Sequence, residues 1–212
     1  NQPGNGGVEK KLAKVFALAN KNIFEMSRSN KAYNGMGTTC TVLVVLDQTI
    51  YYAQVGDSRA YIQKGDSILQ ITEDHTYVQE LVKSGDITAE EAATHPKRNI
   101  LTNAMGTEPD LRIDTGKCNL TFENSDRLLL CSDGLYDYLS DKELKDILNK
   151  NVLKDAAAYM VSQAKIRGGH DNITVVLAEK TGVPKETEKD LKLTRDVDLP
   201  KMTRDADLPS DT

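Results

Sequence analysis

Residues 127–134 read Arg-Leu-Leu-Leu-Cys-Ser-Asp-Gly, an apolar run that ends in an aspartate and a glycine. Such a short apolar run predicts a strand, and Asp133-Gly134 is typical of the turn that ends one. A second apolar run, residues 172–178, begins immediately after Asp171. If these two strands pair antiparallel, the end of one lies beside the start of the other, and Asp133 and Asp171 share one sheet edge.

Strand and helix patterns surround this pair. Further strands are expected at residues 38–46, 49–55, 58–63, 66–71 and 111–122. Residues 38–46 are β-branched and apolar on both faces, so we expect this strand to be covered on both sides. Helices are expected over residues 8–28, 76–83 and 154–166, with two more beginning at the capping-box patterns of Thr88 and Ser140. An antiparallel meander with separate helices predicts an α+β fold.

Two segments differ in character from this core. Residues 74–110 are polar and helix-prone, which predicts a small surface subdomain. Beyond residue 180, a nine-residue pattern, Lys192–Pro200, recurs nearly unchanged as Lys201–Pro209. Because the composition there cannot bury enough apolar surface to offset chain entropy, residues 181–212 are expected to form a disordered tail.

Composition excludes several function classes. The chain has 27 Lys+Arg against 32 Asp+Glu and a net charge of −5, so nucleic acid is not an expected partner. The longest apolar run, residues 41–46, is far shorter than the ~20 residues that a membrane helix needs, so we expect a cytoplasmic protein without membrane contacts. Cys40, Cys118 and Cys131 have no metal-type spacing and are interpreted as structural thiols.

Three aspartates, Asp57, Asp133 and Asp171, lie where a strand meets a turn. One such aspartate is usually a turn residue, but carboxylates that converge at a sheet edge repel one another unless a cation lies between them. Oxygen ligands favour Mg²⁺ or Mn²⁺, and the scattered histidines disfavour zinc. A pair of hard divalent cations is suited to the hydrolysis of phosphate esters.

Six ordered motifs carry a resemblance to a known family. They are Gly35-Met-Gly-Thr-Thr39, Val55-Gly-Asp-Ser-Arg-Ala-Tyr61, Thr72-Glu-Asp-His-Thr76, Asn99-Ile-Leu-Thr-Asn-Ala-Met-Gly106, Leu130-Cys-Ser-Asp-Gly-Leu135 and His170-Asp-Asn-Ile-Thr174. Over about residues 8 to 180, the chain resembles the bacterial metal-dependent Ser/Thr protein phosphatases of the PPM (type-2C) family. The resemblance implies a βα sandwich of two antiparallel sheets with flanking helices, and a flap that matches residues 74–110.

The resemblance also implies a site. Asp133 and Asp171 match ligands of a catalytic pair of Mn²⁺ or Mg²⁺ ions, and Asp57 matches a carboxylate of a third, weaker metal position. Asn172 would orient Asp171, and the flap region 83–86 would influence substrate access. Implied partners are phosphoserine or phosphothreonine proteins and a cognate Ser/Thr kinase, and we expect a monomer. The phosphate-binding group remains unassigned.

One departure from the family pattern leaves alternatives open. The motif Asp-Gly-x-Gly-Gly, which in the family supplies the aspartate that bridges both metals, does not occur in these 212 residues, and nor does the family's phosphate-binding arginine. We therefore expect an N-terminally incomplete domain whose activity alone is doubtful. A non-catalytic binding or regulatory module is one alternative. A serine hydrolase that uses Ser58 with His170 and Asp171 is another.

Overall fold

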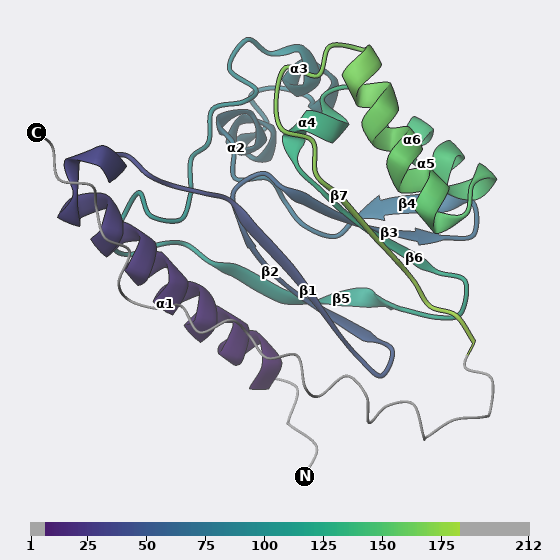
Figure 1. The fold of residues 1–212 in the computed structure, drawn as a ribbon, viewed down its shortest axis with the longest axis horizontal. Helices are drawn as coiled ribbons and strands as arrows, with labels where there is room; N and C mark the ends of the chain where they lie inside the picture. Colours follow the sequence, from purple (N-terminus) through teal and green to yellow (C-terminus); the bar gives the residue numbers. More distant parts are fainter. Residues whose placement is uncertain (1–6, 183–212) are drawn as a thin grey trace, which may run out of the picture. The chain divides into compact units, whose positions relative to one another are not determined.

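The computed structural model describes residues 7–182, and two antiparallel sheets form its centre (Figure 1). One sheet has the order β1-β2-β5, formed by Cys40–Leu46, Thr49–Val55 and Asp114–Thr121. The other has the order β4-β3-β6-β7, formed by Ser67–Gln70, Arg59–Lys64, Arg127–Cys131 and Val175–Glu179. All neighbouring strands in both sheets pair antiparallel, as the sequence patterns predict.

Helices cover the outer face of each sheet (Figure 1). The long helix α1, Gly7–Ser29, packs on the three-stranded sheet, whereas α5, Asp141–Lys150, and α6, Leu153–Ile166, pack on the four-stranded sheet. The remaining short helices are η1 (Lys31–Tyr33), α2 (Tyr77–Ser84), α3 (Ala89–Thr94) and α4 (Asp133–Tyr136). The described chain is therefore an α+β sandwich, and the predicted fold class is confirmed.

Strand periodicity explains how the layers hold together. Tyr61 and Leu129 are register partners on β3 and β6, and both pack in the cluster under α5 and α6. The next pair, Ile62 and Leu128, belongs to the cluster between the two sheets. Because successive side chains of a strand point to opposite faces, two adjacent pairs bury apolar surface in two layers. A third cluster, which includes Phe16, joins α1 to its sheet.

Local capping sets the start of two helices. Ser140 and Glu143 form the predicted reciprocal capping box at the start of α5. Thr88 and Glu91 form a second one at the start of α3. In both cases the side chains satisfy main-chain N–H groups that have no partner within the helix.

Some expected strand boundaries were wrong. The strand expected at residues 38–46 begins at Cys40 and lies at the edge of its sheet. Its two faces are covered, because Val42 packs in the cluster under α1 and Leu43 in the cluster between the sheets, and only its end, Val45 and Leu46, is 37% and 42% exposed. The strand expected at 172–178 begins at Val175. Thr174 is still bonded to Ser132, whose main-chain N–H donates to the Thr174 carbonyl and whose hydroxyl accepts from the Thr174 N–H. The helix α4 was not expected.

The segment 74–110 contains α2 and α3 and is attached to the core at both ends. Near its start, the His75 N–H donates a 2.9 Å hydrogen bond to the Gly56 carbonyl. Near its end, Met105 pairs with Thr38 in an isolated bridge. The expected tail falls almost entirely on residues 183–212, which lie outside the described residues. Among residues 7–182 we find no helix with the length and apolar character needed to cross a membrane.

Candidate metal centre

Asp133 lies where β6 ends and α4 begins. Ser132 precedes α4 as its N-cap residue, but its hydroxyl donates to the Asn172 carbonyl and accepts from the Thr174 N–H, both at 3.0 Å. The Asp133 carboxylate accepts a 2.8 Å hydrogen bond from the N–H of Gly134. The turn that carries Asp133 is thus hydrogen-bonded to the loop that precedes β7.

Asp171 lies in that loop. β6 and β7 pair antiparallel, with Cys131 opposite Val175, so the residues that follow one strand and precede the other meet at one sheet edge. A carboxylate oxygen of Asp171 accepts a 2.6 Å hydrogen bond from the main-chain N–H of Asn172. The contact between Asn172 and Asp171 therefore uses the main chain of Asn172.

Asp57 lies in the turn between β2 and β3, residues 56–58, which we call the Asp57 turn. Gly56 has a φ of +97°, and a Cβ atom there would lie 2.3 Å from the Thr39 methyl group, so only glycine fits. The Tyr136 hydroxyl of α4 donates a 3.0 Å hydrogen bond to the Asp57 carbonyl. This bond joins the Asp57 turn to the helix that begins at Asp133.

Burial and neighbouring negative charges disfavour the ionised forms of these carboxyls. Burial raises the pKa of Asp57 to about 6, and the negative charges of Asp133 and Asp74 add to the rise. Burial also raises the pKa of Asp133, and the charges of Asp171 and Asp137 act in the same direction. A divalent cation among the carboxylates would favour their ionised forms and oppose both effects.

The donor set fits a hard cation in kind but is short in number. Asp57, Asp133 and Asp171 offer only oxygen atoms, which suits Mg²⁺ or Mn²⁺. Within residues 7–182, however, no group of three or more His, Cys, Asp or Glu side chains is placed to hold a metal ion. By themselves, the described side chains do not make up a complete ligand set.

A buried ion pair beside the Asp57 turn was not assigned a role from the sequence. Arg59 donates three hydrogen bonds to the Asp74 carboxylate, through Nε at 3.0 and 2.9 Å and through Nη2 at 2.7 Å. The Arg59 guanidinium carbon lies 3.6 Å from the centroid of the Tyr136 ring, whose hydroxyl binds Asp57. All of these residues except Tyr136 lie within the quoted motifs, but motif position alone did not reveal that they touch.

His75 is a second functional candidate that sequence reasoning did not use. Its side chain is buried and is hydrogen-bonded to Gly56, Asn103 and Asp114. The other predicted arrangement, a serine hydrolase, has no support in the contacts of Ser58. Its hydroxyl lies 2.8 Å from the Thr39 hydroxyl.

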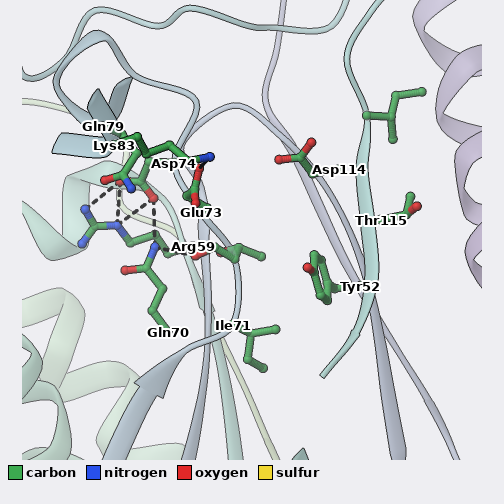
Figure 2. A pocket seen from close by; sticks show the side chains of 12 residues that line it. Tyr52, Arg59, Gln70, Ile71, Glu73, Asp74, Gln79, Lys83, Asp114 and Thr115 are labelled. Atoms are coloured by element: carbon green, nitrogen blue, oxygen red, sulfur yellow. Dashed lines mark hydrogen bonds and ion pairs between the residues drawn. The ribbon is translucent and has the colours of Figure 1, made fainter. Parts of the chain in front are cut away.

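Two cavities lie near this network. The first, of about 650 Å³, opens between the sheets, and Figure 2 shows Arg59, Asp74 and Gln70 on one side of it and Tyr52 and Asp114 on the other. The three candidate metal ligands do not line it, so it is separate from the carboxylate site.

The second cavity, of about 630 Å³, lies between the flap, the end of α4 and the start of α5. Val78 and Ala92 of the flap line one side, and Tyr136 and Asp137 line the other. Arg98 of the flap lies 3.6 Å from Asp137 across this space. The flap region 83–86 ends α2, and there Lys83 pairs with Glu73 at 2.6 Å.

Comparison with known proteins identifies the family. A model of the family "Protein phosphatase 2C" matches residues 2–81. The serine/threonine phosphatase stp of Listeria innocua is 40% identical over 174 residues, which cover 82% of this chain and 68% of the relative. The chain belongs to the protein phosphatase 2C family. The expected PPM membership is confirmed.

Solved structures of this phosphatase family have the same fold. The crystal structure of the serine/threonine phosphatase Stp1 from Staphylococcus aureus matches with a TM-score of 0.78 and 38% identity, covering 86% of this chain and 71% of that chain. The catalytic domain of the protein phosphatase PstP, in complex with two manganese ions, matches with a TM-score of 0.68 and 33% identity, covering 81% and 72%. The PPM-type sandwich is thus confirmed for the described residues.

Proposed function

We propose that the protein removes phosphate from phosphoserine and phosphothreonine side chains of other proteins, with the help of divalent cations held by Asp133 and Asp171. The observation that carries this proposal is the pairing of β6 with β7, which brings both carboxylates to one sheet edge in a chain of the protein phosphatase 2C family. The phosphatase names of the relatives agree with it. A non-catalytic module has no comparable support.

Carboxylates would bind the cations, and neighbouring N–H groups would orient these carboxylates. The N–H groups of Gly134 and Asn172 orient the carboxylates of Asp133 and Asp171. Asp57 would serve a further, weaker position, where its pKa of about 6, raised by burial, lets protons compete with the cation. Water or other residues would complete the coordination. A bound Mn²⁺ or Mg²⁺ supplies Lewis-acid activation of water and neutralises phosphoryl charge. Manganese is supported by the relative that binds two manganese ions.

None of the three candidate carboxylates lines the cavity between the flap and the end of α4, so this cavity would receive substrate residues beside the phosphorylated side chain. It borders Tyr136 and Asp137, which follow Asp133 in α4, and its walls combine apolar side chains with Arg98. Because the three candidate carboxylates come from one chain, a monomer suffices. A protein Ser/Thr kinase would generate the substrates, since a phosphatase of this kind consumes the product of that reaction.

A phosphate-release assay tests the proposal. Phosphate release from a phosphothreonine peptide should require Mn²⁺ and stop with a chelator. Asp133→Asn and Asp171→Asn should each lower the Mn²⁺-dependent rate by on the order of 100-fold or more, because even residues outside the ligand shell change metal affinity by ~10–100-fold. Asp155→Asn, at an exposed aspartate of α6, is the matched control and should leave the rate unchanged.

Two outcomes would contradict the proposal. Near-normal rates in both ligand variants would remove Asp133 and Asp171 from the metal site. Binding of the phosphopeptide by the wild-type protein without release of phosphate at any Mn²⁺ concentration would favour the binding-module alternative.

A further inference from the structure

His75 is the second residue of the flap segment. It makes two hydrogen bonds to the main chain of Gly56, in the Asp57 turn. Its own N–H donates to the Gly56 carbonyl at 2.9 Å. Its side-chain Nδ1 accepts from the Gly56 N–H at 3.2 Å. Both main-chain polar groups of Gly56 are therefore bonded to one residue, which lies 2% exposed.

These bonds determine the tautomer of the imidazole. A main-chain N–H can only donate, so Nδ1 of His75 carries no proton. The remaining ring proton is on Nε2, which donates to the Asp114 carboxylate at 3.0 Å. Asp114 is itself held by Arg112 at 3.0 and 2.9 Å. The imidazole has a definite orientation, with an acceptor toward the Asp57 turn and a donor toward β5.

The same residue joins the two ends of the flap to each other. The Asn103 side-chain amide donates to Nδ1 of His75 at 2.7 Å and to the Arg112 carbonyl at 2.7 Å. The Thr102 N–H donates to the His75 carbonyl at 2.9 Å. His75 near the start of the flap and Asn103 near its end thus meet at one buried ring.

The Asp57 turn has little freedom to move elsewhere. Gly56 is pressed against Thr39, and the Asp57 carbonyl is held by Tyr136. We infer that His75 is a positioning residue. It attaches the start of the flap to the Asp57 turn and thereby sets the metal affinity of the weaker position at Asp57. This inference rests on the proposed function, because it assumes that Asp57 serves a metal.

Two amide variants of His75 separate the role of the Nδ1 bond to Gly56 from that of the Nε2 bond to Asp114. In His75→Asn, the amide oxygen takes the place of Nδ1 and can accept from Gly56, while the donor to Asp114 is lost. In His75→Gln, the amide nitrogen can reach the place of Nε2 and donate to Asp114, while the acceptor for Gly56 is lost. Both variants keep the main-chain bond from residue 75 to the Gly56 carbonyl, and only the second loses the bond to the Gly56 N–H and should loosen the Asp57 turn.

Amide hydrogen exchange and Mn²⁺ titration measure the effect. Without metal, the Gly56 amide should remain protected in the wild type and in His75→Asn but exchange much faster in His75→Gln. With Mn²⁺, His75→Gln should weaken the weaker site by ~10–100-fold, the range for residues that orient ligands, and leave the tighter sites nearly unchanged. His95→Gln, in the flap but bonded only to Lys97 through its ring, is the matched control.

Equal protection of the Gly56 amide in both variants, or equal loss of all Mn²⁺ sites, would overturn the inference and reduce His75 to a general stabilising residue. If His75→Gln does not fold, nitrogen NMR of the wild-type imidazole tests the bond from the Gly56 N–H to Nδ1 instead, because a protonated Nδ1 would contradict that bond. Failure of the wild-type protein to bind Mn²⁺ would refute the proposed function instead, and the amide-exchange result would still test the attachment of the flap.

Discussion

The Tyr136 hydroxyl donates a 3.0 Å hydrogen bond to the main-chain carbonyl of Asp57, across 79 residues of sequence. Tyr136 belongs to the helix that Asp133 begins, so this bond connects the two turns that carry candidate metal ligands. Arg59 packs on the face of the Tyr136 ring and is paired with Asp74. The position of Asp57 thus depends on side chains that need not touch a metal.

Removal of the Tyr136 hydroxyl should loosen this connection. Tyr136→Phe keeps the ring under Arg59 but leaves the Asp57 carbonyl without this donor, so the free energy of unfolding should fall by about 1–2 kcal/mol. Urea unfolding measures the change, and Mn²⁺ titration should show weaker binding at the Asp57 position. Tyr159→Phe, at a side chain 48% exposed, should change stability by less than about 0.5 kcal/mol. Equal effects of the two variants would argue against the role of the bond.

Gly134 should tolerate no side chain. A Cβ atom at this position would lie 2.5 Å from the Asn172 carbonyl oxygen, so Gly134→Ala pushes the Asp171 loop away from Asp133. We expect weaker Mn²⁺ binding together with a loss of stability of about 1–3 kcal/mol, typical of overpacking. Gly65→Ala meets no atom within 4 Å and bears only the cost of a positive φ, so it should leave Mn²⁺ binding intact. Unchanged Mn²⁺ affinity in Gly134→Ala would contradict the close approach.

Arg59 should not be replaceable by lysine. Arg59→Lys keeps the charge but loses the planar fork that binds Asp74 and stacks on Tyr136, so we expect a loss of about 1–3 kcal/mol in the free energy of unfolding. The matched change Arg112→Lys affects a more exposed pair with Asp114 and should cost less than about 1 kcal/mol. Denaturant unfolding of both variants makes the comparison. A larger cost at Arg112 would show that burial of the ion pair does not decide its contribution.

Acid should weaken the attachment of β5 to the flap. Hydrogen bonds from Arg112 outweigh the opposing effect of burial and lower the pKa of Asp114 from 3.8 to about 2, with a further contribution from His75. Because the folded pKa lies below the unfolded one, this contribution to stability is fully present above about pH 4 and is lost as the pH falls toward about 2. Asp114→Asn should therefore flatten the decrease in stability over this range, as measured by thermal unfolding. An identical slope in wild type and variant would rule out this contribution.

Local patterns predicted much of the fold and part of the site. The apolar runs that end in Asp133 and follow Asp171 indicated a strand pair, and β6 and β7 do pair. The capping boxes at Thr88 and Ser140 appear as predicted, since they involve residues only three positions apart. The edge position of β1 was not predicted, because an apolar sequence indicates covered faces but does not reveal how many strands pair with it.

The amino-acid sequence alone determined which residues are candidates for the chemistry and which elements they terminate, because turn aspartates, strand periodicity and helix caps depend on neighbours along the chain. Only the tertiary structure decided that His75 holds Gly56 and that Tyr136 holds Asp57, 19 and 79 residues away. Such contacts depend on strand register and on the packing of α4 against the Asp57 turn. No local pattern in the sequence predicts contacts between residues so far apart along the chain, so these partners are found only in the assembled fold.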